Sequence, residues 1–89
     1  MEIDIKEENG GYKIEFKKVS KTFVHLLKEQ LKESDDVEEV AILKTHPYLE
    51  NPKLWLRTKS KKPSIVIKES IKELINIFGE LEKKFLENF

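Results

Sequence analysis

Alternating apolar and polar positions open the chain. Across Glu2–Glu8, Ile3 and Ile5 point to one side, as they would in a half-buried strand. The alternation resumes over Tyr12–Phe16. Between the two runs, Asn9–Gly11 supplies residues that tolerate positive φ, which two-residue hairpin turns require. The sequence therefore predicts a β-hairpin at the start of the chain.

The next segment changes to helical spacing. Ser20 or Thr22 can cap a helix, and the turn-forming residues 34–36 end it. His25 lies among apolar neighbours and is predicted to be a partly buried structural residue. Leu26 widens the apolar stripe, whose members fall on one side of the helix: Phe23, Val24, Leu27 and Leu31.

Two further strands are predicted at Val37–Thr45 and Leu54–Lys59, paired as a hairpin. The first of them is apolar on both faces, with Val40 and Ile42 against Ala41 and Leu43. A strand of this kind is usually covered on both faces. The other interpretation is a central strand with a half-exposed alanine, and the pattern leaves both open.

The rest of the chain reads as one amphipathic helix, Pro63–Asn88, with proline suited to its first turn. At ~1.5 Å per residue it would be about 39 Å long, twice the ~17–20 Å of a typical strand. Its far half should therefore extend beyond the sheet and be covered by a partner chain, unless the helix bends at Gly79 and folds back. Lys72 falls opposite the apolar seam. The seam has heptad spacing: Ile67, Ile71, Leu74, Phe78, Leu81 and Phe85.

These elements predict an α+β fold in two layers. The order is β-β-α-β-β-α, with a four-stranded antiparallel sheet, two helices on one face and a long C-terminal dimerisation helix. Residues 1–89 form a single domain. Only 38% of the residues are hydrophobic, against ~45–50% in ordinary globular domains. A small, lean domain of this kind gains stability from a partner chain.

Charge argues against nucleic acid or membrane as a direct partner. Lysine and arginine total 17, as do aspartate and glutamate, and Arg57 is the only arginine. Base readout relies on arginine, so no direct sequence-specific nucleic acid contact is expected. The basic run of residues 57–62 is predicted to be a solvated loop. No stretch approaches the ~20 apolar residues of a membrane span. The acidic start lacks the core of a signal peptide, and zero cysteine suits a cytoplasmic protein.

No pattern of catalytic or ligand-binding residues stands out. The chain has no glycine-rich phosphate loop and no cysteine-based zinc spacing. A catalytic zinc needs three protein ligands, and the two histidines, His25 and His46, lie far apart in sequence. Asp35 and Asp36 suit a turn better than a paired-carboxylate site. We therefore expect no catalytic residue, no metal and no cofactor.

The order and spacing of these elements resemble the subunit L family of archaeal RNA polymerase. The resemblance covers nearly the whole chain and departs from the family at Lys21, His25, Glu39 and Ile42. Three further features carry it: residues 22–27, which open the first helix with Thr-Phe and then Leu-Leu, His46-Pro47 after the third strand, and Thr58 ending the fourth.

This resemblance implies a non-catalytic assembly subunit of a DNA-directed RNA polymerase, a nucleotidyltransferase complex that carries out transcription. It would be the small member of a D/L heterodimer, and the pair would be the platform for the large subunits. His46 and Pro47 would form a rigid corner that contacts a large subunit. The expected partner interface comprises Phe23, Leu27, Leu31, Leu74, Phe78, Leu81 and Phe85.

Two other functions remain open. Pterin carbinolamine dehydratases have a similar layout and also carry a His-Pro step, but their acid–base chemistry needs a cluster of histidines. Here Lys44 and Thr45 precede His46, and Lys59 follows Thr58 where that family has another histidine. The second alternative is a free-standing homodimeric interaction module.

Overall fold

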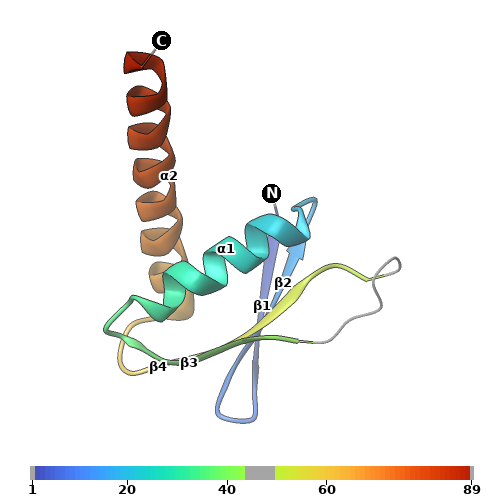
Figure 1. The fold of residues 1–89 in the computed structure, drawn as a ribbon. Helices are drawn as coiled ribbons and strands as arrows, with labels where there is room; N and C mark the ends of the chain where they lie inside the picture. The colour runs from blue at the N-terminus through green and yellow to red at the C-terminus, as the bar shows by residue number, and fades with distance from the viewer. Residues whose placement is uncertain (1, 44–49, 89) are drawn as a thin grey trace.

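The computed structural model describes residues 2–43 and 50–88 of the 89-residue chain. They form one four-stranded antiparallel sheet in the order β1-β2-β4-β3, with both helices on one of its faces (Figure 1). The predicted α+β architecture is confirmed. In chain order the elements are β1 (Glu2–Glu8), β2 (Gly11–Lys17), α1 (Lys21–Lys32), β3 (Val37–Ile42), β4 (Lys53–Thr58) and α2 (Pro63–Glu87).

The first hairpin turns where the sequence predicted it. Glu8 pairs with Gly11, so Asn9 and Gly10 form a two-residue turn. Their φ angles are 50° and 80°, the left-handed values that such a turn needs at both positions. Asparagine and glycine adopt these values at little steric cost, so local sequence determines the register of β1 on β2.

Ser20 is the cap of α1, because its hydroxyl oxygen accepts a hydrogen bond from the Phe23 N–H at 3.1 Å. The buried face of α1 consists of Val24, Leu27 and Leu31. The prediction that His25 is partly buried was wrong, since its side chain is exposed. One residue along a helix turns the side chain by about 100°, which carries this histidine off the buried stripe.

β3 is an edge strand, so the interpretation that made it central was wrong. It ends at Ile42 rather than at residue 45, although the Leu43 N–H still donates to the Lys53 carbonyl at 3.0 Å. Ala41 is half-buried and lies directly opposite Trp55 of β4. Trp55, a neighbour within the sheet, thus accounts for the second apolar face of β3, and no further layer is needed.

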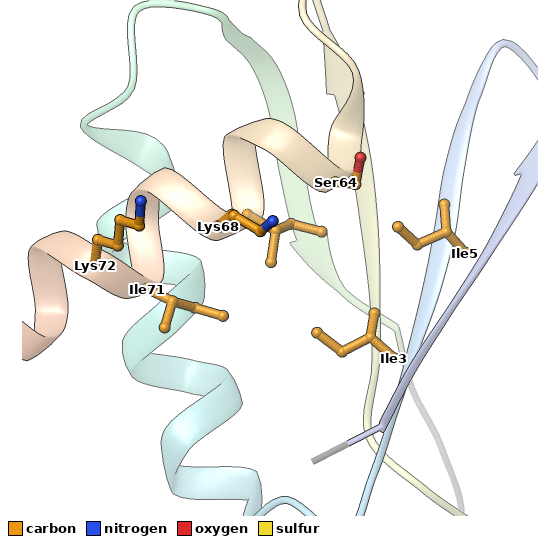
Figure 2. Close-up of a pocket in the computed structure, with 7 residues that line it drawn as sticks. Ile3, Ile5, Ser64, Lys68, Ile71 and Lys72 are labelled. Carbon is orange, nitrogen blue, oxygen red and sulfur yellow. The ribbon is translucent and has the colours of Figure 1, made fainter.

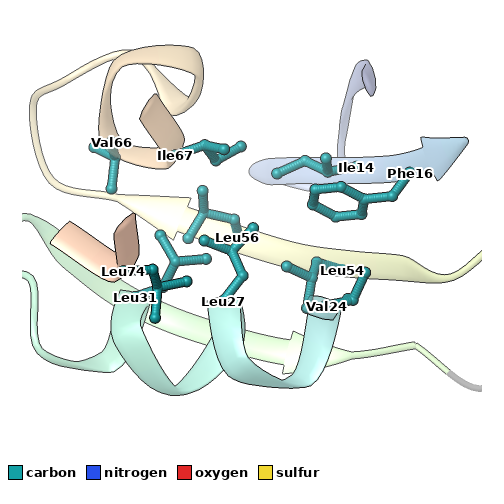
Figure 3. Packing of buried hydrophobic residues seen from close by; sticks show 10 residues of the cluster. All are labelled: Ile14, Phe16, Val24, Leu27, Leu31, Leu54, Leu56, Val66, Ile67 and Leu74. Carbon is teal, nitrogen blue, oxygen red and sulfur yellow. The ribbon is translucent and has the colours of Figure 1, made fainter. Parts of the chain in front are cut away.

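The core lies between the centre of the sheet and the two helices (Figure 3). The paired residues Ile14 and Leu54 bring β2 and β4 together beneath α1 and α2. Every member has at most 6% of its surface exposed. The core contains Ile14, Phe16, Val24, Leu27, Leu31, Leu54, Leu56, Val66, Ile67 and Leu74.

Candidate partner interface

α2 consists of two halves with different surroundings. Its buried residues all lie in the first half, at Pro63, Val66, Ile67, Ser70 and Leu74. From residue 75 to residue 88 no described residue is buried. The helix is 25 residues long, about 37 Å at roughly 1.5 Å per residue, whereas the six residues of β4 span only about 20 Å. The second half therefore rises away from the sheet (Figure 1).

This second half, residues 75–87, is called the overhang below. It carries six large apolar side chains, with exposed fractions from 39% to 63%, within three and a half helical turns. A concentration of exposed apolar surface on a soluble domain marks an interaction site. Its members are Ile75, Ile77, Phe78, Leu81, Phe85 and Leu86.

The helix does not bend at Gly79. α2 is a single helix from Pro63 to Glu87, and this glycine lies within it. The fold-back that would have covered Phe78 and Leu81 with the chain's own sheet is therefore contradicted. Both side chains are about half exposed, at 48% and 57%.

The residues predicted for the partner interface divide into two groups. Leu27 and Leu31 are fully buried and Leu74 is 6% exposed, so the chain's own core takes these three leucines. Assigning them to a partner surface was wrong, because an apolar stripe packs first against its own sheet wherever the sheet reaches it.

Phe23 is half-buried at the edge of that core. Three predicted residues keep exposed surface that a partner could cover: Phe78, Leu81 and Phe85. The sequence-based prediction did not include two other exposed residues of the overhang, Ile77 and Leu86, because they lie beside the heptad positions.

The base of α2 is held by a carboxylate that follows α1. Asp36 accepts hydrogen bonds from the Ser60 N–H, the Ser60 hydroxyl and the Lys61 N–H at 3.2, 2.9 and 2.9 Å. Its own carbonyl accepts from the Lys59 N–H at 2.7 Å. The partners lie more than twenty residues away in sequence, so no local pattern could have revealed them. Asp36 therefore fixes the loop from which α2 starts.

These hydrogen bonds change the acidity of Asp36. Desolvation by burial raises the pKa of its carboxyl group, but the bonds donated by Lys61 and Ser60 lower it by more, so the net pKa lies below the usual value. The group thus stays ionised as a structural anchor. This agrees with the prediction of a turn here rather than a paired-carboxylate site.

The basic run of residues 57–62, which begins in the last two residues of β4, has acidic neighbours. Arg57 lies within 3.2 Å of the Glu38 carboxylate and 3.1 Å of the Glu39 carboxylate. The register shifts between Val37 and Glu39, and such a bulge sets two residues opposite one, which lets both carboxylates reach a single arginine. Lys61 pairs with Glu69 at 3.2 Å. Two of the four cations in this run, Arg57 and Lys61, are therefore already paired with carboxylates.

His46 and Pro47, the predicted contact with a large subunit, lie outside the described residues. Over residues 2–43 and 50–88, no three histidine, cysteine, aspartate or glutamate side chains come close enough to hold a metal ion. In that same part of the chain, no helix has the length and apolar character needed to cross a bilayer.

Known proteins match this chain over a range that includes most of the overhang. The family model of the RNA polymerase Rpb3/Rpb11 dimerisation domain matches residues 12–84, from β2 through most of α2. DNA-directed RNA polymerase subunit Rpo11 of Thermoplasma acidophilum is 28% identical over 85 residues, covering 96% of this chain and 77% of that protein. The Rpo11 subunit of Picrophilus torridus is 30% identical over 77 residues, covering 86% of this chain and 77% of its own length.

A solved structure agrees with these sequence matches. The crystal structure of DNA-directed RNA polymerase subunit L from Thermoplasma acidophilum superimposes with a TM-score of 0.80 at 26% identity. The match covers 99% of this chain and 88% of that one. Its extent includes the overhang as well as the sheet.

Proposed function

Because the chain belongs to the RNA polymerase Rpb3/Rpb11 dimerisation domain family, we propose that it is the small assembly subunit of an archaeal DNA-directed RNA polymerase. In this role it is the L member of the D/L heterodimer. Its larger alpha-like counterpart, the D member of that pair, is called the alpha-like partner below. The pair is the platform on which the large subunits gather, and the chain itself contributes no catalytic residue to nucleotide transfer.

The observation that carries this proposal is the exposed apolar face of the overhang. Phe78, Leu81 and Phe85 are spaced three and four residues apart, which is the spacing of a helix–helix seam. Fully burying a side chain of this size stabilises by roughly 1.5–3 kcal/mol, and about half of that remains available at the exposed fractions seen here. The seam therefore supplies several kcal/mol to an association.

The length of the overhang supports the same conclusion. Most helical stability in proteins comes from packing, and a helical segment that extends beyond the packed part of its helix gains none of it. Residues 75–87 extend α2 by more than three turns, and none of them is buried by the described chain. A partner helix along the seam would supply the missing packing.

The test is co-purification with the alpha-like partner of a variant that combines Phe78→Asp with Leu81→Asp. Pairing should be lost, because two apolar contacts disappear and two carboxylates enter an apolar seam without partners. The matched control is Lys83→Glu, two residues and about 200° around the helix from Leu81. The control should pair normally. Full-yield co-purification of the double aspartate variant would contradict the proposal.

Sedimentation of the unmodified chain separates this function from a free-standing homodimeric module. The proposed subunit forms a stable one-to-one complex with the alpha-like partner, which outcompetes any self-association of the chain. A homodimer that persists at equal concentrations of the alpha-like partner would favour the module instead.

A further inference from the structure

The first half of α2 has two polar sides that differ in charge. Lys68 and Lys72 lie on the side toward β1, beside an apolar groove of about 420 Å³ (Figure 2). Glu69 and Glu73 each follow one of these lysines, so they lie about 100° further round the helix, on the side toward α1. Glu69 precedes Phe78 by nine residues, or about two and a half turns, so the two lie on opposite sides of α2. An alpha-like partner bound along the apolar seam would therefore leave the acidic side accessible.

A polar cleft of about 170 Å³ lies where the end of α1 meets this acidic side of α2. It has room for a few water molecules, at ~30 Å³ each, or for one side chain. Ordinary small-molecule sites are larger, at ~300–1,000 Å³. The occupant that fits is therefore a single side chain of a partner protein. The lining consists of Gln30, Glu33 and Ser34 from the end of α1, and of Glu69, Ser70 and Glu73 from α2.

Ser70 is the one buried polar residue in the described part of the chain, with 6% of its surface exposed. Its hydroxyl group makes no hydrogen bond to any described residue, yet it is not sealed inside the protein, because it lines the cleft. Buried side-chain polar groups in native proteins nearly always have a hydrogen-bond partner. A polar group that enters the cleft would supply one to this serine.

The chain itself balances only part of the negative charge at the cleft. Glu69 lies 3.2 Å from the Lys61 ammonium group. No described cation lies within ion-pair distance of Glu33 or Glu73. The carbonyl end of α1 adds a partial negative charge, which favours cations near the last turn of a helix. The cleft thus favours a positively charged occupant.

The lining favours an arginine over a metal ion or a lysine. Among the described residues, no three metal-ligating side chains are close enough together to hold an ion. A guanidinium group is larger and can span acceptors that lie further apart. The carboxylates only accept hydrogen bonds, and the Gln30 and Ser70 side chains can accept them too. Arginine offers five N–H donors in a rigid planar fork, against three in a lysine ammonium group, which suits it to ion pairs at interfaces.

We propose that this cleft receives an arginine side chain of a large polymerase subunit, whose guanidinium group donates to the Ser70 hydroxyl and pairs with Glu33 and Glu73. The inference rests on the proposed function, because it names a surface through which the heterodimer recruits a large subunit. This surface is separate from the apolar seam, so the alpha-like partner and the large subunit can bind at the same time.

The experiment titrates the purified large subunits against the heterodimer of the alpha-like partner and a chain that combines Glu33→Gln with Glu73→Gln. The affinity should fall by about tenfold or more at low salt, because two charge-assisted contacts are lost, and the loss should shrink at high salt. The matched control combines Glu7→Gln with Glu87→Gln, which remove the same charge at exposed positions outside the cleft. It should bind like the unmodified heterodimer.

Ser70→Ala tests the hydroxyl group separately. Binding of the large subunits should weaken by about fivefold to tenfold, because a hydrogen bond to a charged group is lost. The Tm of the chain alone should not fall, since no described group loses a hydrogen bond and alanine favours a helix more than serine does. A lower Tm with unchanged binding would show that this serine is only structural, and would overturn the inference.

The remaining outcomes separate the inference from the proposed function. Unchanged affinity of the Glu33→Gln/Glu73→Gln heterodimer, when the unmodified heterodimer binds the large subunits, would overturn the inference and leave the proposed function standing. Failure of the unmodified heterodimer to bind the large subunits would contradict both. Lost pairing of the glutamine variant with the alpha-like partner would place the cleft in the heterodimer interface, which also overturns the inference.

Discussion

The two halves of α2 share one apolar repeat and differ in what covers it. Leu74 and Leu81 are seven residues apart on the same side of the helix, yet 6% of the first side chain is exposed and 57% of the second. Leu74 belongs to the core that α1, α2 and the sheet form together, and no described residue of α2 beyond it is buried. A heptad pattern thus predicts that a face will be buried, whereas the distance that the helix extends beyond its own core decides which chain buries that face.

The largest expected effect comes from substituting these two leucines separately. Leu74→Ala should lower the free energy of unfolding of the chain by about 2–5 kcal/mol, because it leaves a cavity in the core. Leu81→Ala should change it by less than about 0.5 kcal/mol, since no core contact is lost. Urea unfolding of the purified chain measures both. Equal losses would mean that the chain itself covers the overhang.

A smaller effect is expected within the overhang, at Gly79. A Cβ atom at this position meets nothing within 4 Å, so alanine fits without strain. Alanine favours a helix by about 1 kcal/mol over glycine, so Gly79→Ala should increase the helical circular dichroism signal and stabilise α2 by up to that amount. A loss of helical signal would show that α2 uses the freedom of the glycine to bend.

The smallest effect concerns the base of α2 and depends on pH. The folded-state pKa of Asp36 is lowered, so its hydrogen bonds stabilise the fold above the unfolded pKa, near 3.9 for aspartate, and are lost as pH falls through the lower folded value. Asp36→Asn should reduce the Tm at neutral pH and flatten its fall below about pH 4.

Thermal melts across a pH series measure this effect. The matched control is Asp35→Asn, one residue away, where the described part of the chain shows no hydrogen bond to the carboxylate. If the Asp36→Asn variant and the unmodified chain gave parallel pH profiles, the carboxylate would not be the anchor of α2.

Much of this fold could be predicted from local patterns. Asn9 and Gly10 specify the first hairpin, Ser20 caps α1, and the heptad seam predicts the full length of α2. These features depend on residues close together in the sequence, so a pattern reveals them.

What could not be predicted depends on long-range placement. The edge position of β3 follows from the pairing of β2 with β4, which are separated by a helix and a strand. The role of Asp36 likewise exists only once distant segments meet. The apolar stripe of α1 could not show that Leu27 faces its own sheet rather than a partner.

Hydrogen exchange along α2, measured in the dilute chain alone and after addition of the alpha-like partner, tests the central claim most directly. The claim is that a partner chain covers the overhang. In the chain alone, amides in residues 66–74 should be protected and those in residues 78–87 should exchange quickly, because an unpacked helical end opens readily. The alpha-like partner should slow exchange across residues 78–87. Strong protection of that segment in the chain alone, or no change on adding the partner, would contradict the account.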